Sequence, residues 1–203
     1  DNDNAALELN DQIRYKWLEF YKVNFKGDWY QRIWQKLVLR ANTEFGFLGA
    51  YNEKAGIVPF ERFYVGGDGM GNFTLDGRDI VALRGYENQS VTPWVINDVT
   101  GQYGQEGAVI YNKFSLELRY PITLKPSASI YALTFLEAGN SFAKFSDFDP
   151  FAVKRSAGVG VRIFMPAFGL LGIDFGYGFD QDYNPSSNGP SGWQTHFIIG
   201  QQF

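Results

Sequence analysis

Apolar and polar residues alternate along most of this chain with a period of two. Between Ala108 and Thr123, apolar residues such as Phe114 and Leu116 occupy every second position, and the positions between them are mostly charged or polar. A pleated strand with one apolar face requires this period. The same pattern recurs along the chain and predicts seven strands and no helix. The predicted strands span residues 12–25, 35–51, 108–123, 128–142, 153–165, 169–180 and 193–203.

The predicted connections alternate in length. Short turns fall near Lys26–Gln31, at 125–127 and at 166–168, whereas long polar loops cover 52–107, 144–151 and 181–192. Short turns on one side and long loops on the other are typical of an outer-membrane barrel. This pattern predicts that the chain begins on the outer side and ends on the periplasmic side. The loop 52–107 contains no predicted strand. A loop of that length in a compact domain is usually either functional or a sign that elements were wrongly assigned; because the strands on both sides are clear, we expect it to be functional.

A soluble β-sandwich is the competing fold, because its strands alternate in the same way. The barrel is favoured because the polar faces are rich in small residues, and because aromatic residues gather near strand ends, where interfacial girdles belong. These aromatic residues are Tyr111, Tyr120, Phe142, Phe164, Tyr183 and Trp193. Seven strands would leave two open edges, which hydrocarbon does not tolerate. We therefore predict an all-β fold in which residues 1–203 form part of one transmembrane antiparallel β-barrel, incomplete on its own.

The composition and net charge argue against several classes of function. The chain has 203 residues, no Cys, one His and a formal net charge of −4. A nucleic-acid partner would need a basic face, and disulfides or a thiolate zinc site would need Cys. No apolar run is long enough for a membrane-spanning helix. The start of the chain, Asp1–Asn4, resembles loop rather than a charged-then-apolar leader, so we expect a mature product or a fragment.

Other candidate sites carry little chemistry. Gly66–Gly71 resembles a phosphate-binding loop, but no predicted helix follows it to supply the anion site. The pairs Asp147/Asp149 and Asp180/Asp182 lack the spacing of a calcium loop. His196 has no second His, Cys or nucleophilic Ser nearby, and we expect it to be a polar residue facing the barrel interior. The sequence therefore predicts no cofactor, no metal site and no enzymatic activity.

Four segments occur in an informative order. The long loop contains Phe60–Gly67, which ends in the pair Gly66 and Gly67, and then Ala82–Glu87. Phe135–Asn140 lies in a predicted strand, and Phe197–Phe203 forms the end of the last one. In this order the segments resemble the BamA family, the central barrels of the outer-membrane β-barrel assembly machine. The stretch 75–93 is most similar to versions from the Bacteroidota.

The resemblance implies a fold, a location and a function. This chain would form the last seven or so strands of a barrel of about 16 strands in a bacterial outer membrane. It would catalyse folding and insertion of β-barrel proteins through a lateral seam. Implied partners are the N-terminal half of the barrel, periplasmic transport-associated repeats, client barrels, assembly-machine lipoproteins and outer-membrane lipid. One side of the seam would be the last strand, with Trp193, Phe197, Gly200 and Phe203; Gly200 could mark a kink.

The loop motif Arg84-Gly85-Tyr86 would hold the loop inside the barrel. Arginine offers five donors in a planar fork and stacks on aromatic rings. Phe135 and Glu137 lie two apart on one strand face, so Arg84 could stack on the first and pair with the second. Gly85 would permit a sharp bend at the loop tip. Glu137 stands where the family has Asp, which leaves its pairing geometry open.

Two alternatives remain open. A related barrel of two-partner secretion, or of the translocation and assembly module, could carry the same Arg-Gly-aromatic loop. The number of periplasmic repeats upstream of this chain would separate these from the assembly barrel. A passive porin-like channel is the second alternative, and it would give steady ion conductance without assembly activity.

Overall fold

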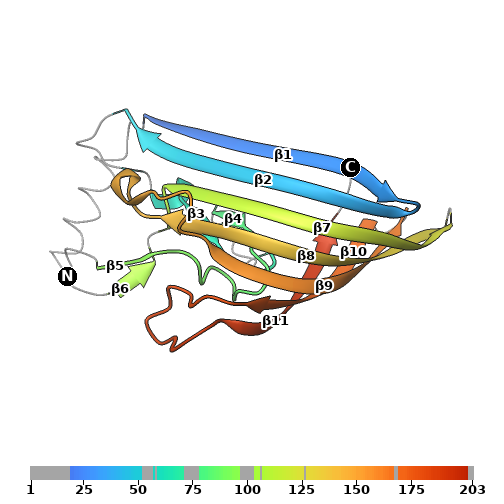
Figure 1. The fold of residues 1–203 in the computed structure, drawn as a ribbon. Coiled ribbons are helices and arrows are strands. Elements are labelled where there is room, and N and C mark those ends of the chain that lie inside the picture. The colour runs from blue at the N-terminus through green and yellow to red at the C-terminus, as the bar shows by residue number, and fades with distance from the viewer. Residues whose placement is uncertain are drawn as a thin grey trace, which may run out of the picture.

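Seven long strands form one antiparallel sheet in the computed structural model (Figure 1). The structure describes residues 19–51, 57, 59–70, 78–96, 103–105, 107–125, 127–166 and 169–200. The sheet order is β1-β2-β7-β8-β9-β10-β11, so each long strand pairs with the next one along the chain. The strands are β1 (Phe20–Trp34), β2 (Leu37–Ala50), β7 (Ile110–Lys125), β8 (Ala128–Phe142), β9 (Lys154–Met165), β10 (Gly169–Gly178) and β11 (Gly192–Gly200).

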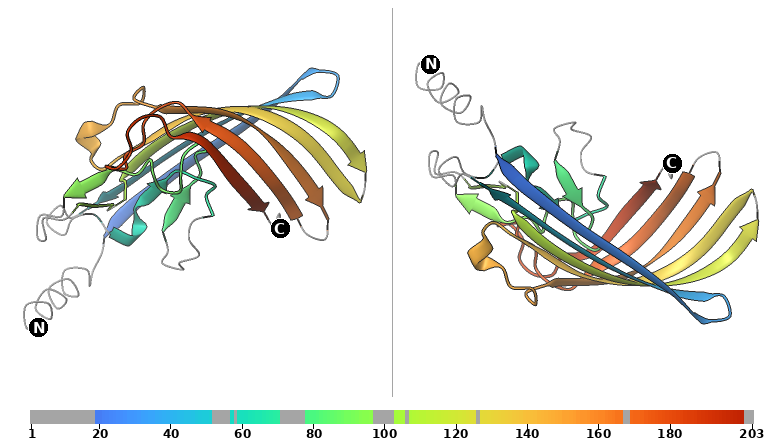
Figure 2. Two further views of the ribbon diagram at one scale, coloured as in Figure 1. Left: turned by 90° about the horizontal axis from the view of Figure 1, so that it is seen from below. Right: turned by 90° about the horizontal axis from the view of Figure 1, so that it is seen from above.

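The sheet is curved and open. Figure 2 shows it as a trough, with β1 at one edge and β11 at the other, and with the elements of the long loop on its concave side. The prediction of an all-β antiparallel and incomplete barrel is confirmed. In the described part of the chain, no helix is long and apolar enough to cross a membrane.

The loop 52–107 was predicted to lack strands, and that prediction is wrong. A short 3-10 helix, η1 (Pro59–Glu61), precedes two pairs of three-residue strands. Strands β3 (Phe63–Val65) and β4 (Asp79–Val81) run parallel, and β5 (Trp94–Ile96) and β6 (Tyr103–Gln105) run antiparallel. Three residues are too few to display a period of two, so pattern reading could not detect these strands. A second 3-10 helix, η2 (Phe145–Asp147), lies between β8 and β9.

The first long strand also differs from the prediction. It was expected at 12–25 with a turn near Lys26–Gln31. Positions 12–18 lie outside the described residues, and β1 runs to Trp34, so that the turn lies at Gln35 and Lys36. Gln35 adopts a positive φ of 43°. Asp28 resembled a turn residue, yet it faces Asn42 across the strand pair and its carboxylate accepts a hydrogen bond from Arg40 Nε at 2.6 Å. The cross-strand ion pair satisfies Asp28 inside the sheet, so no turn is needed there.

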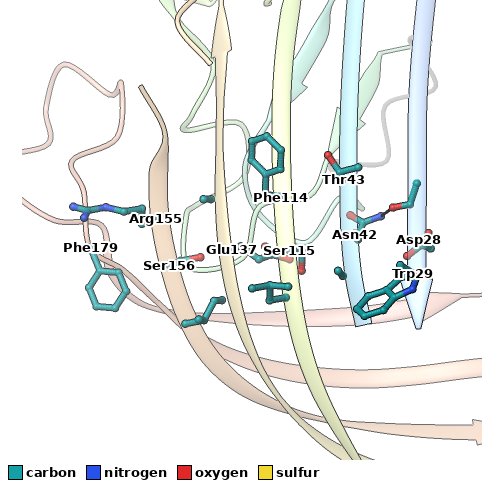
Figure 3. A pocket seen from close by; sticks show the side chains of 15 residues that line it. Asp28, Trp29, Asn42, Thr43, Phe114, Ser115, Glu137, Arg155, Ser156 and Phe179 are labelled. Carbon is teal, nitrogen blue, oxygen red and sulfur yellow. Dashed lines mark hydrogen bonds between the residues drawn. The ribbon is translucent and has the colours of Figure 1, made fainter. Parts of the chain in front are cut away.

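The convex face of the sheet is apolar. Phe25, Leu116 and Ile199 are among its large exposed side chains. A shallow groove crosses this face, and Figure 3 shows Trp29, Phe114 and Phe179 among the side chains that line it. Along each strand these residues alternate with the polar residues of the concave face, as the predicted barrel requires.

The main apolar core lies between the sheet and the long loop. Loop residues Phe63, Val65, Leu83, Tyr86 and Val91 pack together with Leu48 and Tyr111 of the sheet. This burial corrects part of the predicted aromatic girdle. Tyr111 and Phe142 are buried, Tyr183 packs against the loop core and Phe164 is partly buried, whereas Tyr120 and Trp193 are exposed. A position near a strand end does not show whether an aromatic ring turns toward lipid or toward a loop above the strand.

Candidate functional site

Gly66 and Gly67 position the loop tip, which we define as Arg84, Gly85 and Tyr86. Gly67 exchanges two backbone hydrogen bonds with Leu83, each of 3.1 Å, so the tip begins directly after a paired residue. Both glycines have positive φ, +125° and +81°. A Cβ on Gly66 would lie 2.6 Å from the carbonyl oxygen of Glu87. The two glycines therefore let the chain after the tip fold back closely on β3.

The Arg84 guanidinium lies against β8. Its Nε and Nη2 donate to Glu137 Oε1 at 2.9 and 2.6 Å, and its Cζ lies 3.8 Å from the centre of the Phe135 ring. The side chains of Arg84 and Glu137 are 6% and 2% exposed. Charge-assisted hydrogen bonds of this length are about twice as strong as neutral ones. The structure thus brings together the three side chains that the sequence had suggested as a group.

The side chain of Glu137, one methylene longer than that of Asp, lets its carboxylate make two different contacts. Oε1 accepts from the guanidinium, while Oε2 accepts from the Arg84 backbone N–H at 2.8 Å. One carboxylate therefore holds both the side chain and the main chain of the tip. This settles the geometry that the replacement of Asp by Glu left open.

Substitutions at Glu137 should separate these two roles. We expect Glu137→Asp to keep the charge but lose one of the two contacts, because the shorter side chain cannot span both groups. We expect Glu137→Gln to lose the charge and to keep an acceptor for only one of the two groups, because its amide nitrogen can only donate; the loss should be about 1.5–3 kcal/mol for a charged hydrogen bond. Thermal unfolding of the full-length barrel in detergent, read by gel mobility, measures both. Equal stability of the wild type and both variants would contradict the assigned contacts.

Two further carboxylates bind Arg84, and sequence reasoning missed both. Nη2 lies 2.6 Å from Glu117 Oε1 on β7, and Nη1 lies 3.0 Å from Asp174 Oδ2 on β10. These carboxylates have strand partners of their own: Arg119 donates to Glu117 at 2.8 Å and Arg162 to Asp174 at 2.6 Å. Polar residues on the inner faces were visible in the alternation, but nothing in it indicates which of them meet a distant loop.

The cluster keeps Arg84 charged. Burial by itself lowers the pKa of the guanidinium, but Glu137, Glu117 and Asp174 outweigh burial and hold that pKa above its ordinary value. Unpaired buried charges are costly, and here each carboxylate is matched by a cation. The tip therefore joins β7, β8 and β10 through one guanidinium.

Gly85 fits against β10 because that strand has glycines where it passes. Gly85 has a φ of +85°, and a Cβ on it would lie 2.7 Å from Ser156 Cβ and 3.0 Å from Gly178 N. A Cβ on Gly176 would in turn lie 2.8 Å from Gly85 N. The Gly-rich inner face of β10 is thus the surface on which the tip's backbone rests. Bulkier residues there would lift the tip away from the sheet.

Tyr86 completes the tip. Its ring is fully buried, and its hydroxyl donates to the Arg155 carbonyl oxygen on β9 at 2.7 Å. Burial raises the pKa of the Tyr86 phenol, which therefore stays a neutral donor. Beside it, the Gly85 N–H donates to His196 Nε2 on β11 at 2.8 Å. His196 was expected to be a polar residue facing the barrel interior; it does face the concave side, and it is also a direct partner of the tip, which the sequence did not indicate.

The other residues predicted on the last strand lie away from the tip. Trp193 and Phe197 are 71% and 56% exposed on the convex face. Gly200 pairs regularly with Leu170, and a Cβ on it would have 3.8 Å to its nearest neighbour, so neither packing nor pairing requires a glycine there. Phe203 lies outside the described residues.

Comparison with known proteins supplies a family. The Omp85 superfamily domain matches residues 4–203. Among solved structures, BamA from Haemophilus ducreyi lacking POTRA domains 1–3 matches with a TM-score of 0.62 and 20% identity, over 89% of this chain and 35% of that one. The chain thus spans 35% of the length of that BamA structure, and the likeness shows a shared barrel fold. A comparison with curated proteins finds no match. Because the family match covers almost every residue, the chain belongs to the Omp85 superfamily.

Proposed function

We propose that this chain is the C-terminal half of a BamA-type barrel that folds and inserts β-barrel proteins into a bacterial outer membrane. Membership of the Omp85 superfamily and the BamA-like fold support this assignment. The rest of the barrel and periplasmic transport-associated repeats would complete the protein, and assembly-machine lipoproteins would act with it. Its origin in the Bacteroidota stays a prediction. The work proposed is non-covalent and needs no cofactor.

The edge position of β11 carries this proposal. Within the described residues β11 pairs with β10 on one side and with no strand on the other. An edge strand presents unpaired N–H and C=O groups that another strand can bind. A client strand would add to this edge by β-augmentation, in which main-chain hydrogen bonds give affinity and alternate side chains give specificity. In the whole barrel, the first strand of the N-terminal half would close the same edge weakly.

The strands near this edge are also short. β7 has 16 residues, whereas β9 has 12 and β10 has 10. At about 3.3 Å per residue, β10 spans about 33 Å and β7 about 53 Å. A narrower apolar band beside the seam would thin the adjacent bilayer, as a short hydrophobic stretch does elsewhere. Local thinning would lower the barrier to client insertion.

Reconstitution of the full-length protein into proteoliposomes tests the function. We expect an unfolded client barrel to become protease-resistant and heat-modifiable faster in these vesicles than in empty ones. Conductance is recorded on the same preparation. Steady ion flow with no acceleration of client folding would replace the assembly proposal with a passive channel.

Proline substitutions on β11 test the edge mechanism. In an antiparallel edge strand, neighbouring residues direct their N–H groups alternately toward the paired strand and toward the free edge. We therefore expect one of Ile198→Pro and Ile199→Pro to remove a free edge donor and slow client folding while preserving barrel stability. The other should weaken pairing with β10 and lower stability instead. Ile199→Val is the control, with no change expected in either measurement.

Client folding at the wild-type rate in both proline variants would contradict the edge mechanism. The reconstitution assay would still decide whether the protein is an assembly barrel.

A further inference from the structure

His196 occupies the point where the last strand meets the loop tip. It lies in the middle of β11, stands opposite Asp174 of β10 in the strand pairing, and is 4% exposed. Its Nε2 accepts the Gly85 N–H at 2.8 Å. Arg84, the residue before Gly85, donates a hydrogen bond to the carboxylate of Asp174. Two consecutive residues of the tip thus bind side chains of the last two strands: Arg84 binds Asp174 on β10, and Gly85 binds His196 on β11.

The sense of this hydrogen bond determines the protonation state of the imidazole. A backbone N–H can only donate, so Nε2 must carry a lone pair. A neutral imidazole has one donor and one acceptor nitrogen, and its proton must therefore sit on Nδ1. An imidazolium carries protons on both nitrogens and would place Nε2–H against the Gly85 N–H. Protonation and this hydrogen bond exclude each other.

Charged groups surround the ring on several sides. Burial of the ring opposes an imidazolium most strongly, and Arg84 opposes it too, whereas the carboxylates of Asp68 after β3, Asp174 on β10 and Glu137 on β8 favour it. The carboxylates Glu137 and Asp174 are already bound to guanidinium groups. Histidine is the side chain whose ordinary pKa allows such a change between about pH 5 and 8. Lowering the pH would therefore change the charge of one identified side chain, His196, inside this site.

We propose that His196 is a positioning residue that joins the seam strand to the loop tip through its neutral imidazole, and that protonation of the ring releases this link. The proposal rests on the proposed function only in treating β11 as the seam strand. Arg84 would remain bound to β8 and β10, while β11 alone would lose its tie to the loop. The seam strand would then move independently of the strands that hold the loop.

The tautomer is tested directly by solid-state NMR of ¹⁵N-histidine-labelled full-length protein in lipid. The His196 signals are assigned as those that disappear in His196→Gln. At pH 7.5 we expect a protonated Nδ1 and an unprotonated Nε2. A protonated Nε2 at this pH would overturn the proposal.

Hydrogen exchange of the peptide that contains Gly85 tests the release, with rates corrected for the intrinsic effect of pH. In the wild type we expect protection to fall about fivefold to tenfold between pH 7.5 and 4.5, the effect of losing one hydrogen bond. His196→Gln offers an acceptor that does not titrate and should keep its protection at both values. His196→Phe keeps a ring but no acceptor and should show reduced protection at both.

Identical pH profiles for the wild type and His196→Gln, or full protection in His196→Phe at pH 7.5, would overturn the proposal. No client protein enters these measurements. Their outcome is therefore independent of whether the barrel proves to be an assembly factor.

Discussion

Arg84→Ala is expected to lower the free energy of unfolding of the barrel by about 3–5 kcal/mol, the usual effect of removing one member of a buried ion pair. The variant would leave Glu137, Glu117 and Asp174 close together inside the protein without the guanidinium that they share. Arg119 and Arg162 remain bound to two of them, whereas Glu137 keeps only Lys113, whose Nζ lies 3.8 Å from Oε1, so Glu137 should contribute most of the loss. Unfolding of the full-length protein in detergent, followed by gel mobility against temperature or urea, measures the change.

Arg155→Ala is the matched control. Arg155 also pairs with a carboxylate, donating to Asp180 at 2.8 Å, but its side chain is 64% exposed. Exposed ion pairs add little stability, and we expect no measurable change. If both arginine variants lose the same stability, burial of the cluster is not what makes Arg84 important.

A second substitution identifies the source of the loss. In the Arg84→Ala background, Glu137→Gln removes the charge that has lost its partner. We expect the double variant to be more stable than Arg84→Ala alone, because the two residues are coupled and their effects are not additive. A simple sum of the two single losses would show that the charge on Glu137 plays no part.

Gly85→Ala should release the loop tip from β10. The new methyl group would meet Ser156 Cβ at 2.7 Å and the backbone of β10 at about 3 Å, in a backbone conformation with φ of +85°. Overpacking typically costs about 1–3 kcal/mol. The left-handed conformation adds a strain of about 1–3 kcal/mol. We expect the tip to lift, and the readouts are the unfolding midpoint and faster proteolysis of the loop.

Gly192→Ala separates the two contributions. Gly192 has a φ of +77°, close to that of Gly85, but nothing lies within 4 Å of the position of a Cβ. Its substitution carries the conformational strain without the collision, so we expect a smaller loss and no change in proteolysis of the loop. Gly200→Ala, which has neither cost, should resemble the wild type. Equal effects at Gly85 and Gly192 would contradict the close packing of the tip.

The alternation of side chains was sufficient to predict the sheet. The long strands have an apolar and a polar face, and their period of two is visible locally in the sequence. Six of the seven strands lie within about two or three residues of their predicted bounds. The first strand was misplaced because Gly27 and Asp28 resemble a turn, while the ion pair that accommodates Asp28 comes from Arg40 on the next strand. The grouping of Arg84 with Phe135 and Glu137 came from the resemblance to a family.

The sequence by itself thus determined an all-β chain with one apolar face, a long loop and a distinctive Arg-Gly-Tyr tip. Tertiary structure alone decided that Glu117, Asp174 and His196 also meet this tip, and that the glycines of β10 make room for it. The hydrogen bonds to these three partners join residues that are 33, 90 and 111 positions apart in the chain. Alternation places each of them on an inner face, but it contains no information about how strands are offset or how far a loop reaches. The register and curvature of the sheet set those distances, and they are properties of the fold as a whole.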